Sequence, residues 1–216
     1  MSDTISLLFS FVALAISAVT AYLTLFRRGT VKMTQPTTIF FGPDGRGFSD
    51  SSKVYFRTLL FATSKRGRII ESMHIALFRT ETQQIFNIWV FGDEKLSRGS
   101  GLFVGENGIA ANHHFLTPED AKRFRFLEGK YKLKVFAQLV GDRRERLLFT
   151  LTLDIPSDIA ARLKEPNTGL YFDWSPSSKT YLSHLEKRTQ PLSPEEFLKL
   201  MMPERISNEQ TKGEQS

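Results

Sequence analysis

Cysteine is absent from all 216 residues of the chain. Disulfide bonds, cysteine nucleophiles and thiolate-bound zinc or iron–sulfur clusters are therefore excluded. Tryptophan and tyrosine are scarce, at 2 and 5 residues, whereas phenylalanine occurs 19 times, which favours a core lined by phenylalanine. The length suits one ordinary domain with appendages and is too short for two full-sized domains.

Charge is missing from a long stretch near the N-terminus. Ile5 to Phe26 contains no charged side chain, and its only polar residues are Ser, Thr and one Tyr. At about 1.5 Å per residue this stretch forms roughly 33 Å of helix, which matches a hydrocarbon core of about 30 Å. We predict one transmembrane helix, with residues 1–28 as an N-terminal anchor.

A cleaved secretory signal is the rival interpretation of this stretch. Such a signal has a basic leading segment and a shorter apolar run. Here the leading segment, Met1 to Thr4, contains Asp3 and no Lys or Arg, and the apolar run continues beyond the possible cleavage site at Val19–Ala21. An uncleaved anchor fits better. Basic residues follow the helix, at Arg27, Arg28 and Lys32, so the positive-inside rule predicts an outside N-terminus and a cytoplasmic domain.

Small residues recur along the predicted helix at spacings of three and four, which places them on one face. Small side chains let two membrane helices approach closely, so we expect this face to mediate helix–helix contact, either in a homo-oligomer or with another membrane helix. The alternative is that Ser, Ala and Thr are simply common in membrane helices. The small-residue stripe consists of Ser10, Ala13, Ser17 and Ala21, continued by Ser6 and Thr24.

Residues 29–155 show many short strand-like segments separated by turns. The clearest are Tyr131 to Leu139 and Leu147 to Ile155, where apolar and polar residues alternate strictly on both sides of Gly141-Asp142. Alternation with a period of two is typical of half-buried antiparallel sheet. A second hairpin is predicted at Asn107-Gly108, between Leu102–Val104 and Ile109–Leu116. The pattern predicts a mainly β, antiparallel β-sandwich.

A short segment resembles a known corner. Glu128-Gly129-Lys130-Tyr131-Lys132-Leu133 is similar to the corner before the penultimate strand of immunoglobulin-like and fibronectin-like sandwiches, where a Tyr hydroxyl bonds back to the upstream backbone. The layout of one N-terminal helix and a sandwich also resembles small uncharacterised bacterial single-pass membrane proteins. The resemblance implies an immunoglobulin-like architecture and implies no activity.

The composition changes after Pro156, and residues 156–203 read as an extension with short helices. We expect helices over Ser157–Lys164, from Ser175-Pro176 through Leu185, and over Phe197–Met202 behind the capping box Ser193-Pro194-Glu195-Glu196. The polar residues 204–216 are expected to be disordered.

Local motifs for catalysis or for cofactor binding are missing. The first place to consider for an active site is Asn112-His113-His114, but adjacent residues on a strand point to opposite faces, so the two histidines would not share a metal ion. We therefore expect no metal and no cofactor. A membrane-tethered enzyme with a site around His113 and His114 remains the alternative.

Basic residues are more suggestive, because the net charge is +6. They can form a contact site for anionic lipid or an acidic protein. Nucleic-acid binding is less expected, because the aromatic residues do not interleave with these basic residues in any recognisable motif. The alternative is a solvated face that protects an edge strand. The sequence thus predicts a non-catalytic interaction module at the cytoplasmic membrane surface, with candidate contact residues Lys130, Lys132, Lys134, Arg143, Arg144 and Arg146.

Overall fold

The computed structural model describes residues 2–26, 28–44, 51–99, 101–118 and 124–187. The chain divides into the units 1–186 and 187–216, and the architecture below is that of the first unit. The expected helix behind Ser193 and the expected disordered tail lie outside the described residues.

An apolar helix begins the chain, as predicted. The α-helix α1 (Ser2–Ala21) continues into a π-helical turn, η1 (Tyr22–Phe26). Within the described residues, the stretch Asp3–Thr24 is the one helix long and apolar enough to cross a membrane, and none of it is buried by the rest of the chain.

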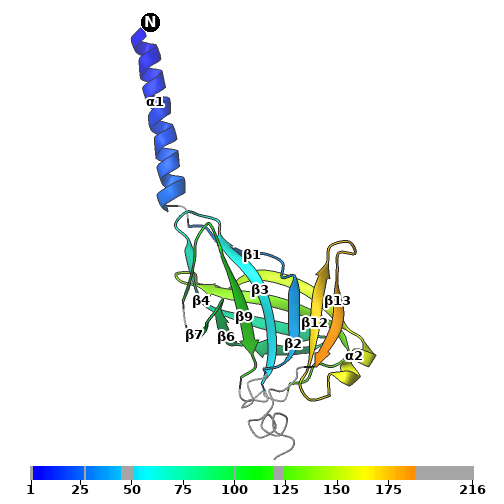
Figure 1. Ribbon diagram of the computed structural model, residues 1–216. Coiled ribbons are helices and arrows are strands. Elements are labelled where there is room, and N and C mark those ends of the chain that lie inside the picture. The colour runs from blue at the N-terminus through cyan, green and yellow to red at the C-terminus, as the bar shows by residue number, and fades with distance from the viewer. Residues whose placement is uncertain (1, 27, 45–50, 100, 119–123, 188–216) are drawn as a thin grey trace, which may run out of the picture. The chain divides into compact units, whose positions relative to one another are not determined.

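The larger sheet, sheet A, has eight strands among the described residues, in the order β13-β12-β2-β3-β9-β6-β7, with β1 also pairing with β3. Figure 1 shows β3, β2, β12 and β13 side by side. Every pairing in sheet A for which a register is defined is antiparallel. The strands are β1 (Val31–Met33), β2 (Thr38–Pro43), β3 (Ser52–Ala62), β6 (Ile88–Gly92), β7 (Leu96–Arg98), β9 (Ile109–Leu116), β12 (Thr168–Ser175) and β13 (Thr180–Lys187).

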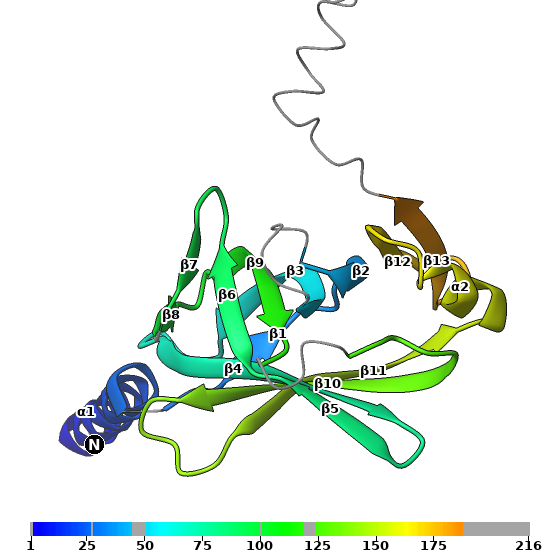
Figure 2. The same ribbon diagram turned by 90° about the horizontal axis from the view of Figure 1, so that it is seen from below.

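The smaller sheet, sheet B, has five described strands in the order β11-β10-β4-β5, and β8 pairs with the beginning of β4. Figure 2 shows the two sheets as separate layers, with the short helix α2 (Ser157–Arg162) on the connection from β11 to β12. The fold is therefore a two-sheet antiparallel sandwich, as predicted. The strands are β4 (Arg68–Arg79), β5 (Thr82–Phe86), β8 (Leu102–Val104), β10 (Gly129–Leu139) and β11 (Arg146–Ile155).

One apolar core lies between the sheets, because residues from both contribute to a single buried cluster. Phenylalanine lines it, as the composition suggested: the most deeply buried large side chains include Phe41, Phe56, Phe86, Phe115 and Phe172. The chain passes directly from sheet B to sheet A at Asn87, between β5 and β6. Among the described residues, the core cluster begins at Val31, so the helix contributes nothing to it.

The predicted hairpin of β10 and β11 is confirmed, with one correction in its register. Val135 lies opposite Phe149, and Phe136 lies opposite Leu147, so Leu148 is an extra residue on β11. A β-bulge of this kind shifts the alternation by one position. Leu147, which the period-two pattern placed on the same face as Phe149, is consequently 53% exposed.

The tyrosine corner forms the hydrogen bonds that its resemblance implied. The Tyr131 hydroxyl donates to the Leu127 carbonyl over 2.9 Å and accepts the Leu127 N–H over 2.8 Å. Burial raises the pKa of Tyr131, so the hydroxyl stays protonated and able to donate. Gly129, with φ of 121°, provides the preceding turn. These bonds support the corner, while the immunoglobulin-like subclass stays a prediction.

The helix expected from Ser175 to Leu185 is wrong, because β12 ends at Ser175, a turn follows, and β13 begins at Thr180. Tyr181 and Leu185 lie four positions apart, a spacing that fits one face of a helix and equally one face of a strand. Both pack against the core, and β13 pairs with β12 at the edge of sheet A. The sandwich therefore extends beyond residue 155 and includes β12 and β13.

The hairpin predicted at Asn107-Gly108 is also wrong. β8 pairs with β4 in sheet B, whereas β9 pairs with β3 and β6 in sheet A. The turn at Gly105–Gly108 links the two sheets instead of two neighbouring strands. Gly108 has a positive φ of 76°. A turn needs this conformation both in a hairpin and in a connection between sheets, so the Asn-Gly motif does not distinguish the two.

Candidate functional site

The predicted arginines lie at the turn between β10 and β11. Arg143 and Arg144 are exposed, while Arg146 donates from Nε to Asp142 Oδ2 over 2.9 Å. The other oxygen of Asp142 accepts a hydrogen bond of 2.7 Å from Arg68. Arg68, followed by Arg146, holds the pKa of Asp142 below its usual value, so this carboxylate stays charged and fixes the turn.

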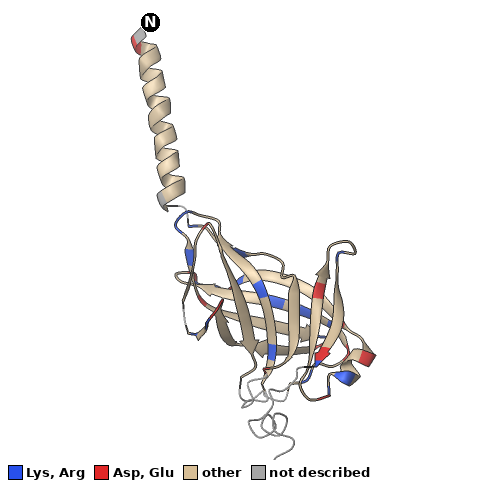
Figure 3. Ribbon diagram, in the orientation of Figure 1, with Lys and Arg blue, Asp and Glu red and all other residues tan. Residues whose placement is uncertain are grey.

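The three predicted lysines do not join these arginines in one site. Lys130, Lys132 and Lys134 face outward along β10, beginning at the end of the strand that is remote from the β10–β11 turn. Lys130 lies opposite Asp154, and Lys134 lies 5.0 Å from the centre of the Phe78 ring. Strand β10 is about 35 Å long at ~3.3 Å per residue, so the lysines and arginines are spread along it and its following turn and do not gather at one end. Figure 3 shows Lys and Arg distributed over the domain, with Asp and Glu among them.

The two adjacent histidines point to opposite faces of β9, as predicted. His113 faces the core and has no exposed surface. The His114 ring lies on the outer face, 4.7 Å from the ring of Tyr55. Within the described residues, no group of three His, Asp or Glu side chains is placed to hold a metal ion.

His113 is held neutral in the core. Its Nδ1 accepts a hydrogen bond of 3.1 Å from Trp89 Nε1, so the proton of the neutral ring is on Nε2, which has no partner among the described residues. Burial, with a smaller contribution from His114, lowers the pKa of His113 to about 4. A substrate cannot reach a base that is enclosed in this way, so His113 is a structural residue.

A row of rings crosses the outer face of sheet A, and sequence reasoning missed it. The pairing registers place Tyr171 opposite Phe40, Phe40 opposite Tyr55, and Tyr55 opposite His114. These four residues, here called the aromatic row, therefore lie side by side on four neighbouring strands. The Tyr171 and Phe40 ring centres are 5.0 Å apart.

The aromatic row is partly enclosed although it faces away from the core. Phe40 is 1% exposed, and Tyr55, His114 and Tyr171 are half-buried. The Phe40 ring lies against the backbone of Gly42 and Gly169, where an added Cβ would approach it within 2.6 Å. Glycine at these two positions thus makes room for the ring.

Ion pairs flank the aromatic row on both sides. Arg57 donates to Asp93 over 2.6 Å and to the side-chain oxygen of Asn112 over 3.3 Å. The same Asn112 oxygen accepts the Tyr55 hydroxyl over 3.2 Å. On the other side, the buried Lys53 lies 3.2 Å from Asp44. The hydrogen bond from Arg57 lowers the pKa of Asp93, which keeps this pair charged.

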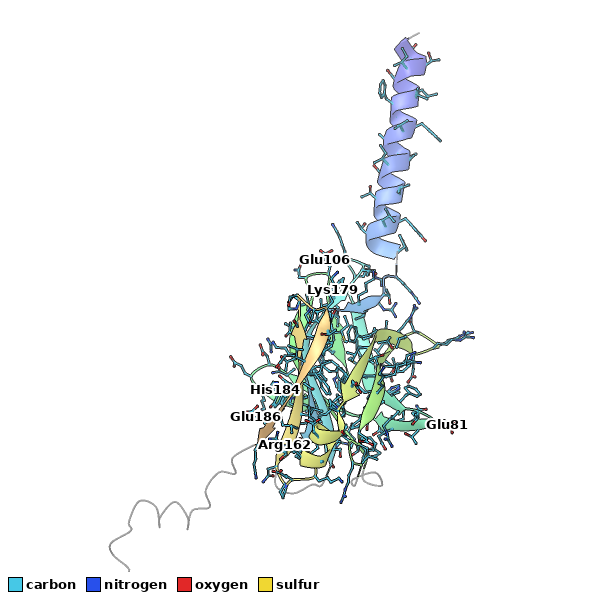
Figure 4. All side chains as sticks on the ribbon, turned by 90° about the vertical axis from the view of Figure 1, so that its right-hand side faces the viewer. Glu81, Glu106, Arg162, Lys179, His184 and Glu186 are labelled. Atoms are coloured by element: carbon cyan, nitrogen blue, oxygen red, sulfur yellow. The ribbon has the colours of Figure 1, made fainter. Side chains whose placement is uncertain are left out.

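His184 on β13 extends the aromatic row at its other end (Figure 4). Its ring stacks on Tyr171 with the centres 5.4 Å apart, and its Nδ1 lies 3.1 Å from Asp173. Thr38 donates to the other oxygen of Asp173 over 2.8 Å. The accessible parts of the Tyr55, His114, Tyr171 and His184 rings, with the exposed Arg57–Asp93 pair beside them, suit stacking and hydrogen bonding.

The small-residue stripe lies on α1. Ser10, Ala13, Ser17 and Ala21 all precede the π-helical turn, and Thr24 lies within it. The Ser10 hydroxyl donates to the carbonyl of Ser6 over 3.0 Å, which reduces the cost of placing this polar group in lipid. Contact between this stripe and another helix stays a prediction.

Comparison with known proteins yields no family. No protein-family model matches the sequence, and no curated protein matches it either. Among solved structures, the chain is similar to the CooA pilin subunit of enterotoxigenic Escherichia coli, with 11% identity, a TM-score of 0.27, and coverage of 56% of this chain and 99% of that one. It is also similar to AggA, the major subunit of aggregative adherence fimbriae type I of Escherichia coli, with 8% identity, a TM-score of 0.18, and coverage of 74% and 89%. Likenesses at these scores assign no function.

The buried His113 predicts a specific loss of stability in acid. Its folded pKa of about 4 lies below the unfolded value of 6.5, so its stabilisation is complete above pH 6.5 and is lost as the pH falls toward 4. The free energy of unfolding should fall by roughly 2–3 kcal/mol between pH 6.5 and 4.5. Urea unfolding of the detergent-solubilised chain at both pH values measures this difference.

His113→Gln is the matched variant, because the amide keeps an acceptor for Trp89 and does not titrate. It should be less stable at pH 7 and nearly independent of pH in the same range. An equally steep acid loss in His113→Gln would show that another group is responsible.

Proposed function

We propose that the protein is a single-pass, membrane-tethered β-sandwich that acts as a non-catalytic interaction module at the cytoplasmic membrane surface. The observation that carries this proposal is that the core is complete without the helix. The core cluster begins at Val31, and none of the span Asp3–Thr24 is buried by the domain. The apolar side chains of α1 therefore need apolar surroundings outside the domain.

A lipid bilayer supplies those surroundings over the whole length of the helix. The side chains around α1 are exposed on every face, including Leu7, Phe9, Phe11 and Leu14, and a helix that is apolar all round is typical of a membrane span. The residues that follow, Arg27, Arg28 and Lys32, favour a cytoplasmic domain by the positive-inside rule. A secretory signal is the competing interpretation of the same helix.

The aromatic row supports an interaction role for the domain. The half-buried rings of Tyr55, His114 and Tyr171 lie in one row with the buried Phe40, and the exposed Arg57–Asp93 pair lies beside them, which gives an amphipathic surface. Aromatic side chains are enriched at protein interfaces because they bury a large area at a small cost in entropy. An enzyme built around His113 and His114 is disfavoured, since His113 is enclosed and His114 faces the other side of the sheet.

Membrane insertion and orientation can be tested together. We expect the full-length chain to keep its N-terminal helix, to resist extraction by carbonate, and to give activity to a C-terminal reporter that works only in the cytoplasm. Replacing Arg27 and Arg28 by Glu should weaken or reverse this orientation, because those charges hold the domain inside. A shortened chain in the soluble fraction would identify a cleaved signal and reject the proposal.

The aromatic row should carry the binding of a partner. The partner is first captured by purifying the detergent-solubilised chain, and its dissociation constant is then measured for the wild type and for Tyr55→Ala. We expect Tyr55→Ala to raise this dissociation constant at least about tenfold, since truncating a central aromatic contact costs about 1.4 kcal/mol or more. Phe136→Ala is the matched control, because Phe136 is a half-buried ring on the outer face of sheet B. Equal effects of the two substitutions would remove the aromatic row from the proposal.

The small-residue stripe is proposed to mediate association between membrane helices. In lipid, close approach of two backbones supplies the attraction, so Ala13→Leu combined with Ser17→Leu should block it sterically. Energy transfer between labelled full-length chains in vesicles measures the association, and Leu8→Ala on the opposite side should leave it unchanged. The same signal from the wild type and the double variant would indicate a monomeric tether.

A further inference from the structure

Hydrogen bonds attach the segment that follows the helix to one end of the domain, the end that carries the loop between β3 and β4. Thr30 donates its N–H to the Thr63 hydroxyl over 2.9 Å, and Thr63 donates its own N–H to the Thr30 carbonyl over 2.9 Å. Arg68 donates to the Gly29 carbonyl over 3.1 Å. The chain is thus secured to the loop between β3 and β4 as soon as it leaves the helix.

The connection between helix and domain is too short to let this end move far away. Only three residues separate Phe26, the last residue of η1, from the secured residue Thr30. Four fully extended steps span at most about 14 Å. The headgroup layer on each side of a bilayer is roughly 5–8 Å thick, so the end of the domain beside Gly29 lies within reach of it.

Exposed apolar side chains gather at this end. Ile69 on β4 lies opposite Phe103 on β8, and the Val140 N–H donates to the Ile69 carbonyl. These three residues form a continuous row, here called the apolar row, and they are 44%, 61% and 52% exposed. The ring of Phe103 lies over Gly67, in the same loop that holds Thr30.

This gathering is not typical of the rest of the domain. Outside the N-terminal helix, the described residues include six large hydrophobic side chains that are well exposed. The three residues of the apolar row are among them, and a fourth, Leu147, lies on the neighbouring strand β11. The other two are Leu127 and Leu182.

Basic residues surround the apolar row. The segments 28–30, 63–69, 101–108 and 140–147 contain seven Lys or Arg and three acidic residues, which are Glu106, Asp142 and Glu145. Asp142 is already paired with Arg68 and Arg146. Exposed arginines remain at Arg143 and Arg144. Apolar side chains bordered by cations match an anionic bilayer surface.

We propose that this end of the domain docks on the headgroup layer of the membrane that holds the helix, with the apolar row inserted at the interface and the surrounding cations on anionic lipid. The proposal rests on the proposed membrane insertion of α1. It favours lipid over a second copy of the chain because the connection of three residues keeps this end of the domain within reach of the bilayer that holds the helix. The domain is therefore held in one orientation.

Electron paramagnetic resonance on the full-length chain tests this docking directly, because a chain without cysteine accepts a single nitroxide label at any introduced cysteine. The chain is placed in vesicles of phosphatidylcholine with phosphatidylglycerol. We expect labels at Phe103→Cys and Val140→Cys to be several times more accessible to oxygen, relative to a water-soluble nickel complex, than a label at Leu127→Cys. Leu127 is an exposed residue beside the start of β10, at the opposite end of sheet B. Glu81→Cys, also at that end (Figure 4), is a second control.

The role of charge is tested in the same assay. Arg143→Gln with Arg144→Gln should lower the relative oxygen accessibility at Val140→Cys in the mixed vesicles and should have no such effect in pure phosphatidylcholine. Thermal unfolding of each labelled chain confirms that its fold is retained.

A label at Leu14→Cys, in the middle of α1, separates the two ways in which the proposal can fail. If Leu14→Cys lies in hydrocarbon while Phe103→Cys and Val140→Cys behave like Leu127→Cys, docking is overturned and the membrane anchor stands. If Leu14→Cys is open to the nickel complex, the anchor and the docking both fail. Labels at Phe103→Cys and Val140→Cys that are shielded from both reagents would show contact with another protein chain and would also overturn the docking.

Discussion

The apolar core shared by the two sheets is the constraint on which the rest of the molecule depends. Strands from both sheets fill it, and the chain crosses between sheets where a short step suffices, as at Asn87 between Phe86 and Trp89. Phe172 and Leu170 on β12 complete it from residues well beyond the last predicted strand. Because the core is filled in this way, the apolar helix has no place in it and must be accommodated elsewhere.

Arg68, at the start of β4, joins sheet B to the segment that follows the helix. Its guanidinium donates to the Gly29 carbonyl, to Asp142 and to the Val140 carbonyl, so one side chain joins the segment after the helix to the β10–β11 turn. The Arg68–Asp142 pair is mostly buried, and removing one partner of such a pair is more damaging than the pair is stabilising. Arg68 therefore secures the segment after the helix together with the Thr30–Thr63 hydrogen bonds, a role that the sequence does not reveal.

Local patterns predicted the helix, the β10–β11 hairpin and the tyrosine corner, because each depends on residues close together in sequence. Two errors have the same cause. The segment from Thr180 to Leu185 fits a helix or a strand when taken alone, and the edge of β12 decides between them. Asn107-Gly108 requires a turn, but only the distant strands β3 and β4 decide which sheet each flanking segment joins.

The aromatic row could not be predicted for a related reason. Tyr171, Phe40, Tyr55 and His114 come from four separate segments, and a shift of one residue in any register would disperse them. His113 and His114 were correctly assigned to opposite faces, because that follows from strand geometry alone. The six basic residues are spread along β10 and its following turn, and their use as one contact site stays a prediction.

The short connection after the helix also sets the height at which the domain can act. Tyr55 lies seven residues along β3 from Ala62, beside the secured end, which is about 23 Å at ~3.3 Å per residue. With α1 in a bilayer and the apolar row docked as proposed, the aromatic row stays at a nearly constant height, at most about 23 Å above the secured end. A partner attached to the same membrane with its own contact surface at that level meets the aromatic row in two dimensions, at a high effective concentration. A partner whose contact surface lies much closer to the lipid, or much farther from it, cannot reach the aromatic row, whatever side chains it presents.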